Sequence, residues 1–113
     1  MMQALRKNFL GLSVAQATVN LEAMDITNYG MVCCSIVSLT GAVGTYKLQQ
    51  SNDGTNWADV VTGDVTGTVA GSLVAAGVSI INCRGLSSSL VRLQIIKSAG
   101  GTQLHDIIMI AKG

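Results

Sequence analysis

The sequence predicts an all-β domain, an antiparallel, jelly-roll-like β-sandwich of about seven or eight strands. Apolar and polar residues alternate in short segments, which is the period of a half-buried strand. Turn residues separate these segments at sandwich-like spacing, and no long amphipathic helix pattern interrupts them. The chain has 113 residues, so we expect a single sandwich domain over 18–113 with an N-terminal segment, 1–17, ahead of it.

The N-terminal segment 1–17 is compatible with three structures. Met2, Leu5 and Phe9 have near-helical spacing, so a short helix is one of them. An extended apolar arm that straps a neighbouring subunit is the second. The third is a first strand of the domain's own sheet.

The first half of the domain shows strand patterns from residue 18 onward. In 18–24, Val19 and Leu21 alternate with polar neighbours, and 27–30 resembles a turn. Residues 31–39 form a predicted strand that is apolar on both faces. A glycine-flanked connection leads to the half-buried strand at 46–50.

The second half continues with strands at 57–61, 78–82, 90–97 and 102–111. The last of these ends in an unbroken apolar run at 107–110. Residues 62–77 are rich in glycine and low in charge, and we expect a loose hairpin or a long surface loop there.

The segment YKLQQSNDGTNWADV, residues 46–60, contains the strongest turn signal in the chain. Asn52, Asp53 and Gly54 favour a tight hairpin, because glycine readily supplies the positive φ that such turns need. Trp57, the only tryptophan, follows on the returning strand. We expect its ring to close one end of the sandwich near Tyr46 or Leu48.

Low charge content predicts that the protein associates with other subunits. Only 12% of the residues are charged, against about 25% in a typical globular chain, and the net charge is +1. One face of a sandwich strand meets its own core, so the outward half of an all-apolar strand needs another partner. The predicted interface residues, from the N-terminal segment and the two apolar strands, are Met2, Leu5, Phe9, Leu10, Val32, Ile36, Ile108 and Ile110.

Several function classes lack their sequence signals. The seven basic residues are scattered, which argues against nucleic acid, and no apolar run reaches the roughly 20 residues that span a membrane. His105 is the only histidine, and no nucleophile motif accompanies it. We therefore predict no enzyme activity, no metal and no cofactor.

The three cysteines are Cys33, Cys34 and Cys83, an odd number with an adjacent pair. Such a set is a poor disulfide framework and too small for a metal site. Adjacent residues of a strand point to opposite faces, so we expect Cys33 and Cys34 to lie in different environments.

The hairpin resembles one found in discoidin-type, galactose-binding-like β-sandwiches. The matching positions are Tyr46, Leu48, Ser51, Asp53, Gly54 and Trp57. Residues 44–112, with SNDGTNW and the later SSLVRLQI, also resemble small β-sandwich structural proteins of tailed bacteriophages.

The phage resemblance implies a non-enzymatic virion structural protein, made in the host cytoplasm. We expect a capsid decoration or cement protein that forms homo-oligomers and contacts the major capsid protein or another virion protein. Arg6 and Lys7 would then pair with acidic groups of the capsid. The alternative is a carbohydrate-binding or receptor-binding module that uses Asn52, Asn56 and Trp57.

Overall fold

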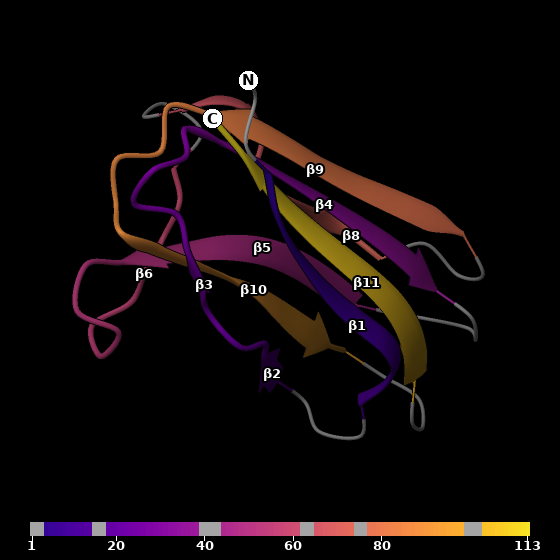
Figure 1. The fold of residues 1–113 in the computed structure, drawn as a ribbon. Helices are drawn as coiled ribbons and strands as arrows, with labels where there is room; N and C mark the ends of the chain where they lie inside the picture. Colours follow the sequence, from indigo (N-terminus) through magenta and orange to yellow (C-terminus); the bar gives the residue numbers. More distant parts are fainter. Residues whose placement is uncertain (1–3, 15–17, 39–43, 62–64, 74–76, 99–102) are drawn as a thin grey trace.

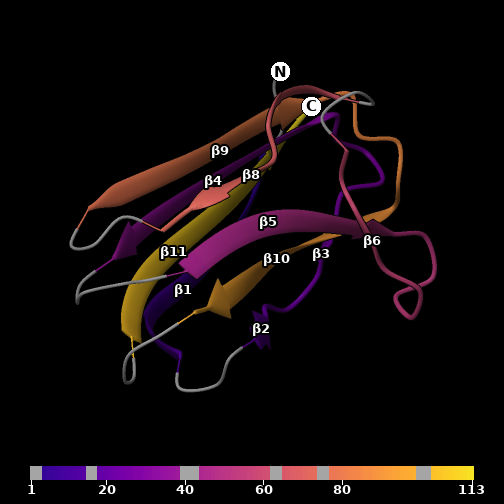
Figure 2. The same ribbon diagram turned by 180° about the vertical axis from the view of Figure 1, so that it is seen from behind.

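The computed structural model describes residues 4–14, 18–38, 44–61, 65–73, 77–98 and 103–113. In these ranges the chain forms eleven strands and no helix. The strands make two antiparallel sheets that pack face to face (Figures 1 and 2). The predicted all-β sandwich is thus confirmed, while its jelly-roll-like character stays a prediction.

Sheet A has five strands, and the order across it is β1, β11, β4, β9, β7. The bounds are β1 Ala4–Val14, β4 Met31–Ser38, β7 Thr66–Thr68, β9 Val78–Arg84 and β11 Gln103–Lys112. Sheet A therefore combines strands from both ends of the described chain with strands from the middle of the sequence.

Sheet B is built on the long pair β5, Gly44–Ser51, and β10, Leu90–Lys97. Short strands flank this pair: β2 Thr18–Asn20 and β3 Met24–Asp25 on β10, and β6 Ala58–Asp59 and β8 Ala70–Ser72 on β5. Eleven strands are observed instead of seven or eight because the expected strand at 18–24 is divided into β2 and β3, and because 62–77 contributes β7 and β8.

The core lies between the inner faces of the two sheets. Alternate residues of β4, β9 and β11 are buried, and so are alternate residues of β10. Ile36 and Ile107 of sheet A and Leu48 and Leu93 of sheet B are fully buried. Burying each such side chain contributes about 1.5–3 kcal/mol, so this layer is the main source of stability.

Residues 4–14 form β1 and pair with β11 along their whole length, so the strand alternative applies and no helix forms there. The helical spacing of Leu5 and Phe9 is also strand spacing, since residues four apart share one face of a strand. A bulge between Phe9 and Leu12 places Gly11 at φ 65°, and its N–H donates to Asp106 Oδ1 at 2.7 Å.

The inner face of β1 carries a charged side chain, that of Lys7. Lys7 lies opposite Met109, a core residue, and its ammonium group pairs with Glu22 and donates to the Ala23 carbonyl. Lys7 is therefore engaged within the molecule and is not the free capsid contact that the sequence suggested.

The described part of 62–77 passes from one sheet to the other. β7 pairs with β9 in sheet A and β8 pairs with β5 in sheet B, with buried Val69 between them. The chain fits tightly at Gly67, where an added Cβ would lie 2.0 Å from the Asn82 carbonyl oxygen. This segment contributes to the sandwich instead of forming the loose hairpin or surface loop expected.

Candidate interaction surface

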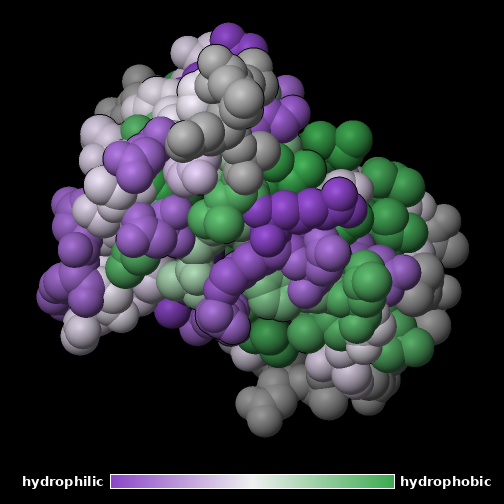
Figure 3. Space-filling model, in the orientation of Figure 1, coloured by the Kyte–Doolittle hydropathy of each residue, from purple (hydrophilic) through white to green (hydrophobic). Residues whose placement is uncertain are grey.

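The outer face of sheet A carries apolar side chains that the described residues leave partly uncovered. Exposure reaches 67% for Leu10, 60% for Ile80 and 56% for Val78. The half-buried apolar residues on the same face are Met31, Val37, Ile108 and Ile110. Figure 3 shows hydrophobic side chains gathered on this side of the molecule, next to a band of hydrophilic ones.

Strand register brings these side chains together in rows. Ile108 of β11 lies opposite Ser35 of β4, which lies opposite Ile80 of β9. The next row, beside the bulge, contains Asp106, Val37 and Val78. Ser35 and Asp106 interrupt these two rows. Val37 is nevertheless a diagonal neighbour of both Ile108 and Ile80, about 7–8 Å away, so apolar side chains adjoin across three strands.

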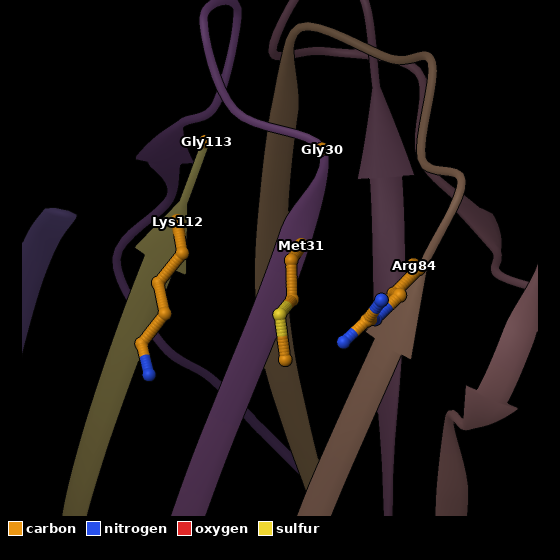
Figure 4. A pocket seen from close by; sticks show the side chains of 5 residues that line it. All are labelled: Gly30, Met31, Arg84, Lys112 and Gly113. Carbon is orange, nitrogen blue, oxygen red and sulfur yellow. The ribbon is translucent and has the colours of Figure 1, made fainter. Parts of the chain in front are cut away.

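The other end of this face is cationic and hollow. Lys112 of β11 lies opposite Met31 of β4, which lies opposite Arg84 of β9. Figure 4 shows the Met31 side chain between the two cations. A hollow of about 480 Å³ is lined by Gly30, Met31, Arg84, Lys112 and Gly113.

The predicted interface residues do not all lie on one surface. Ile108 and Ile110 lie on the outer face of sheet A, and Leu10 is exposed on β1. Leu5 and Phe9 are partly buried against the core, and Met2 lies outside the described residues.

Val32 and Ile36 correct the prediction, because both are 0% exposed and belong to the core. A strand with apolar residues on both faces does not reveal which face turns inward. The outward residues of β4 are Met31, Cys33, Ser35 and Val37.

The hairpin at 51–57 forms around Asp53. Its carboxylate accepts the backbone N–H groups of Thr55 and Asn56, both at 2.8 Å, and the Asn56 side-chain amide at 2.7 Å. The hydrogen bond from the backbone N–H of Asn56, followed by that from Thr55, holds the pKa of Asp53 well below its usual range. Gly54 has φ 78°, the positive value that the sequence predicted.

Trp57 does not close the core as expected. Tyr46 and Leu48 are buried in the core, whereas the Trp57 ring stacks on Arg92, 4.2 Å from ring centroid to guanidinium carbon. Arg92 in turn donates to Gln49 Oε1 at 2.9 Å, on the outer face of sheet B. The indole N–H donates to the Gly54 carbonyl at 3.2 Å, so Trp57 holds the loop against this outer face.

A second hollow lies beside the hairpin. It measures about 320 Å³ and is lined by Gln50, Ser51, Asn52, Asn56, Ala58, Ser87 and Ser88. Asn52 spans to the facing loop, where its Oδ1 accepts the N–H of Ser89 at 2.9 Å. The two predicted asparagines thus do lie together at a polar concavity.

His105 is part of a buried hydrogen-bonded set at the start of β11. Its Nδ1 is 3.1 Å from Ser38 Oγ, and its Nε2 is 3.2 Å from Gln103 Oε1. An amide oxygen only accepts, so Nε2 carries the proton and Ser38 donates to Nδ1. Burial lowers the pKa of His105 and favours this neutral form.

The three cysteines are unpaired, and the adjacent pair is split between environments as predicted. Cys34 and Cys83 are buried, and burial raises the pKa of both thiols, that of Cys83 to about 11. Cys33 is half-buried on the outer face of sheet A, 3.6 Å from Asn82 Oδ1. The accessibility of the Cys33 thiol therefore indicates whether another molecule covers that face.

No three His, Cys, Asp or Glu side chains gather among the described residues in a way that would hold a metal ion. Across the same ranges no helix has the length and hydropathy needed to cross a bilayer.

Comparison with known proteins gives structural likeness only. No protein-family model and no curated protein sequence matches this chain. The fold is similar to the PBSX exported protein XepA, with a TM-score of 0.69 and 12% identity over 96% of this chain and 37% of that one. This chain thus spans about a third of the length of XepA.

Two further structures match over nearly their whole length. The SPBc2 prophage-derived protein YomS has a TM-score of 0.63 and 10% identity, with 98% of this chain and 96% of that one covered. PirA has a TM-score of 0.53 and 7% identity, with 97% and 93% covered. At these identities the likeness establishes the fold, and the resemblance of the hairpin to discoidin modules remains a prediction.

Proposed function

We propose that this chain is a non-enzymatic structural protein of a bacteriophage virion, and within the virion a capsid decoration or cement protein. One observation carries the proposal: the outer face of sheet A exposes several large apolar side chains, including Ile80, Val78 and Leu10. Contiguous apolar surface of this kind marks sites of protein–protein contact.

The mechanism of attachment is burial of this face against a neighbouring subunit. Fully burying one exposed Val, Leu or Ile contributes about 1.5–3 kcal/mol, and ordering losses offset part of that gain. A single contact of a few such residues is weak. Many identical copies on one shell make the attachment durable through multivalency.

The structural neighbours support the phage assignment without fixing the place in the virion. YomS is prophage-derived, and the likeness covers 96% of it, so a sandwich of this size exists in a phage-derived protein. The virion location and the decoration role are our extension from the exposed face of sheet A.

The test compares particles that carry wild-type and altered chains. In the double variant Ile80→Glu/Ile108→Glu, charge enters the centre of the face without touching the core. We expect mass spectrometry to find the wild-type chain in many copies in purified phage particles and to find the variant lost from them. A control, Thr18→Glu/Thr45→Glu, alters exposed residues of sheet B that β10 separates, as β4 separates Ile80 from Ile108, and should leave incorporation unchanged.

Cys33 gives a second readout of the same contact. In the free folded chain it is the half-buried thiol, while Cys34 and Cys83 are buried, so a maleimide should label one thiol quickly. In particles we expect Cys33 to be protected. Absence of the wild-type chain from particles, or equal labelling of Cys33 there, would reject the proposal.

Homo-oligomerisation, expected from the low charge content, is tested separately by light scattering of the purified chain. We expect association that increases with concentration, whereas a strict monomer at high concentration counts against contacts between copies.

A carbohydrate-binding module is the second candidate, and the half-buried Trp57 beside the polar hollow at Asn52 and Asn56 favours it. Sugar rings stack on aromatic faces, and amide groups bond their hydroxyls. We would test it with a glycan array. Binding that Trp57→Ala and Asn56→Ala both remove would support this function, and an array without signal would reject it.

A further inference from the structure

The hollow at one end of sheet A lies between two cations on a shared face. Lys112, Met31 and Arg84 occupy one row of three neighbouring strands. Neighbouring strands are about 4.8 Å apart, so the two charged side chains start roughly 10 Å from each other. Met31 forms the apolar floor between them (Figure 4).

These cations have no acidic partner in the part of the chain that the structure describes. The ion pairs there are Lys7 with Glu22 and Lys47 with Asp59, and both lie away from the hollow. Arg6 adds a third positive charge one row further, opposite Ile110. Like charges that share a face repel, so an anion in the hollow would be stabilised by all three.

The protein's own described acids are already engaged, which disfavours a second copy as the source of that anion. Asp25 accepts from Thr27, and Asp106 accepts from Gly11. Asp53 is bonded within its loop, and the two remaining acids, Glu22 and Asp59, are in the ion pairs named above. A second copy would have to share a carboxylate that already holds a loop, a strand or a lysine of its own, whereas an acidic segment of another protein brings carboxylates without such contacts.

We infer that the hollow binds a carboxylate from an acidic segment of a different protein, with an apolar side chain of that segment against Met31. The inference rests on the proposed attachment role and names the chemistry of the partner. Arg84 provides a planar fork that suits a carboxylate, and Lys112 provides a point charge from the opposite side. Apolar residues of the same face continue the contact beyond the hollow.

The test uses the whole chain with methyl-labelled methionine and NMR. Met31 is half-buried in the hollow, whereas Met24 and Met109 are fully buried and serve as internal references. The probe is an acetylated peptide, Glu-Leu-Glu-Glu-Leu-Glu. We expect it to shift the Met31 methyl signal, less so as salt rises, and we expect the Gln-for-Glu peptide to leave the signal in place.

The variant Arg84→Gln/Lys112→Gln should weaken peptide binding about tenfold or more, since it removes both charge-assisted contacts. Its control, Thr18→Glu/Ser87→Glu, lowers the net charge by the same two units at exposed sites away from the hollow. We expect the control to bind the acidic peptide nearly as the wild type does.

Three results would overturn the inference. One is a Met31 signal that ignores the acidic peptide. The second is an equal response to sodium sulfate, which would make the hollow a site for small anions. The third is a Met31 shift on concentrating the chain alone that Arg84→Gln/Lys112→Gln abolishes, which would make a carboxylate of a second copy the occupant of the hollow. A chain that binds the peptide but is absent from particles would reject the attachment role alone.

Discussion

The outer faces of the two sheets differ in how far the protein satisfies them by itself. On sheet B, Lys47 pairs with Asp59 at 3.1 Å, and Gln49 donates to the same carboxylate at 3.0 Å. Arg92 joins this network and stacks on Trp57. On sheet A, apolar side chains lie open and the cations Arg84 and Lys112 lack acidic partners among the described residues.

This difference separates a face whose polar groups the protein satisfies by itself from a face that it leaves open. A face whose charges are bonded internally has little to gain from a partner, because contact would first require breaking those bonds. A face with open apolar rows gains from every residue that it buries. The same sandwich therefore presents one self-sufficient side and one side suited to docking.

The largest expected effect is a difference in stability between variants of two consecutive β11 residues, Ile107 and Ile108. Ile107 is fully buried, so Ile107→Ala should lower the free energy of unfolding by about 2–5 kcal/mol. Ile108 points outward, so Ile108→Ala should cost less than about 1 kcal/mol while weakening attachment. Urea denaturation measures both. Equal losses in the two variants would mean that the outer face is structurally covered.

A smaller effect concerns the buried His105 and depends on pH. Its pKa is lowered in the folded protein, so below about pH 6.5 the unfolded chain binds a proton that the folded chain does not. The free energy of unfolding should therefore stay level above that pH and fall as pH decreases toward 5. His105 is the only histidine, so His105→Gln should flatten this slope. An unchanged slope in the variant would assign it to other groups.

The smallest effect tests the self-sufficient side. Trp57→Phe removes the indole N–H bond to Gly54 and weakens the stacking on Arg92, at a cost of about 1 kcal/mol. Thermal unfolding should show a modest decrease, with Arg92→Gln giving a similar one. Because the pair interacts, the double variant should lose less than the two single losses combined, and full additivity would deny the contact.

The fold class could be predicted because strand periodicity and turn signals are local properties of the chain. The turn at Gly54 and the split of Cys33 from Cys34 follow from backbone conformation and from the two-residue period. The returning strand predicted at 57–61 is present as the short β6, paired with β5. The sheet change at Val69 could not be predicted in this way, because it depends on long-range pairing of β7 with β9 and of β8 with β5, which leaves no periodic signal in three residues.

The sequence predicted that an apolar surface would face outward, but it did not predict which residues form that surface. Apolar residues on both faces of 31–37 indicated an outward contact, but the choice between Val32 and Cys33 as the outward residue requires the position of the second sheet. Arg84 and Lys112 are 28 positions apart and meet only through strand register. Trp57 was misplaced because Arg92, its stacking partner, lies in a distant strand.

Lys7 on the inner side of β1 has a consequence for how such a protein behaves when crowded. β1 ends the strand order of sheet A as described, and an open strand border can recruit further strands into fibrils. A strand added at this edge would have to place its apolar side chains against the ammonium group of Lys7, which is paired with Glu22. Lys7 thus disfavours the addition of further strands at the β1 edge of sheet A.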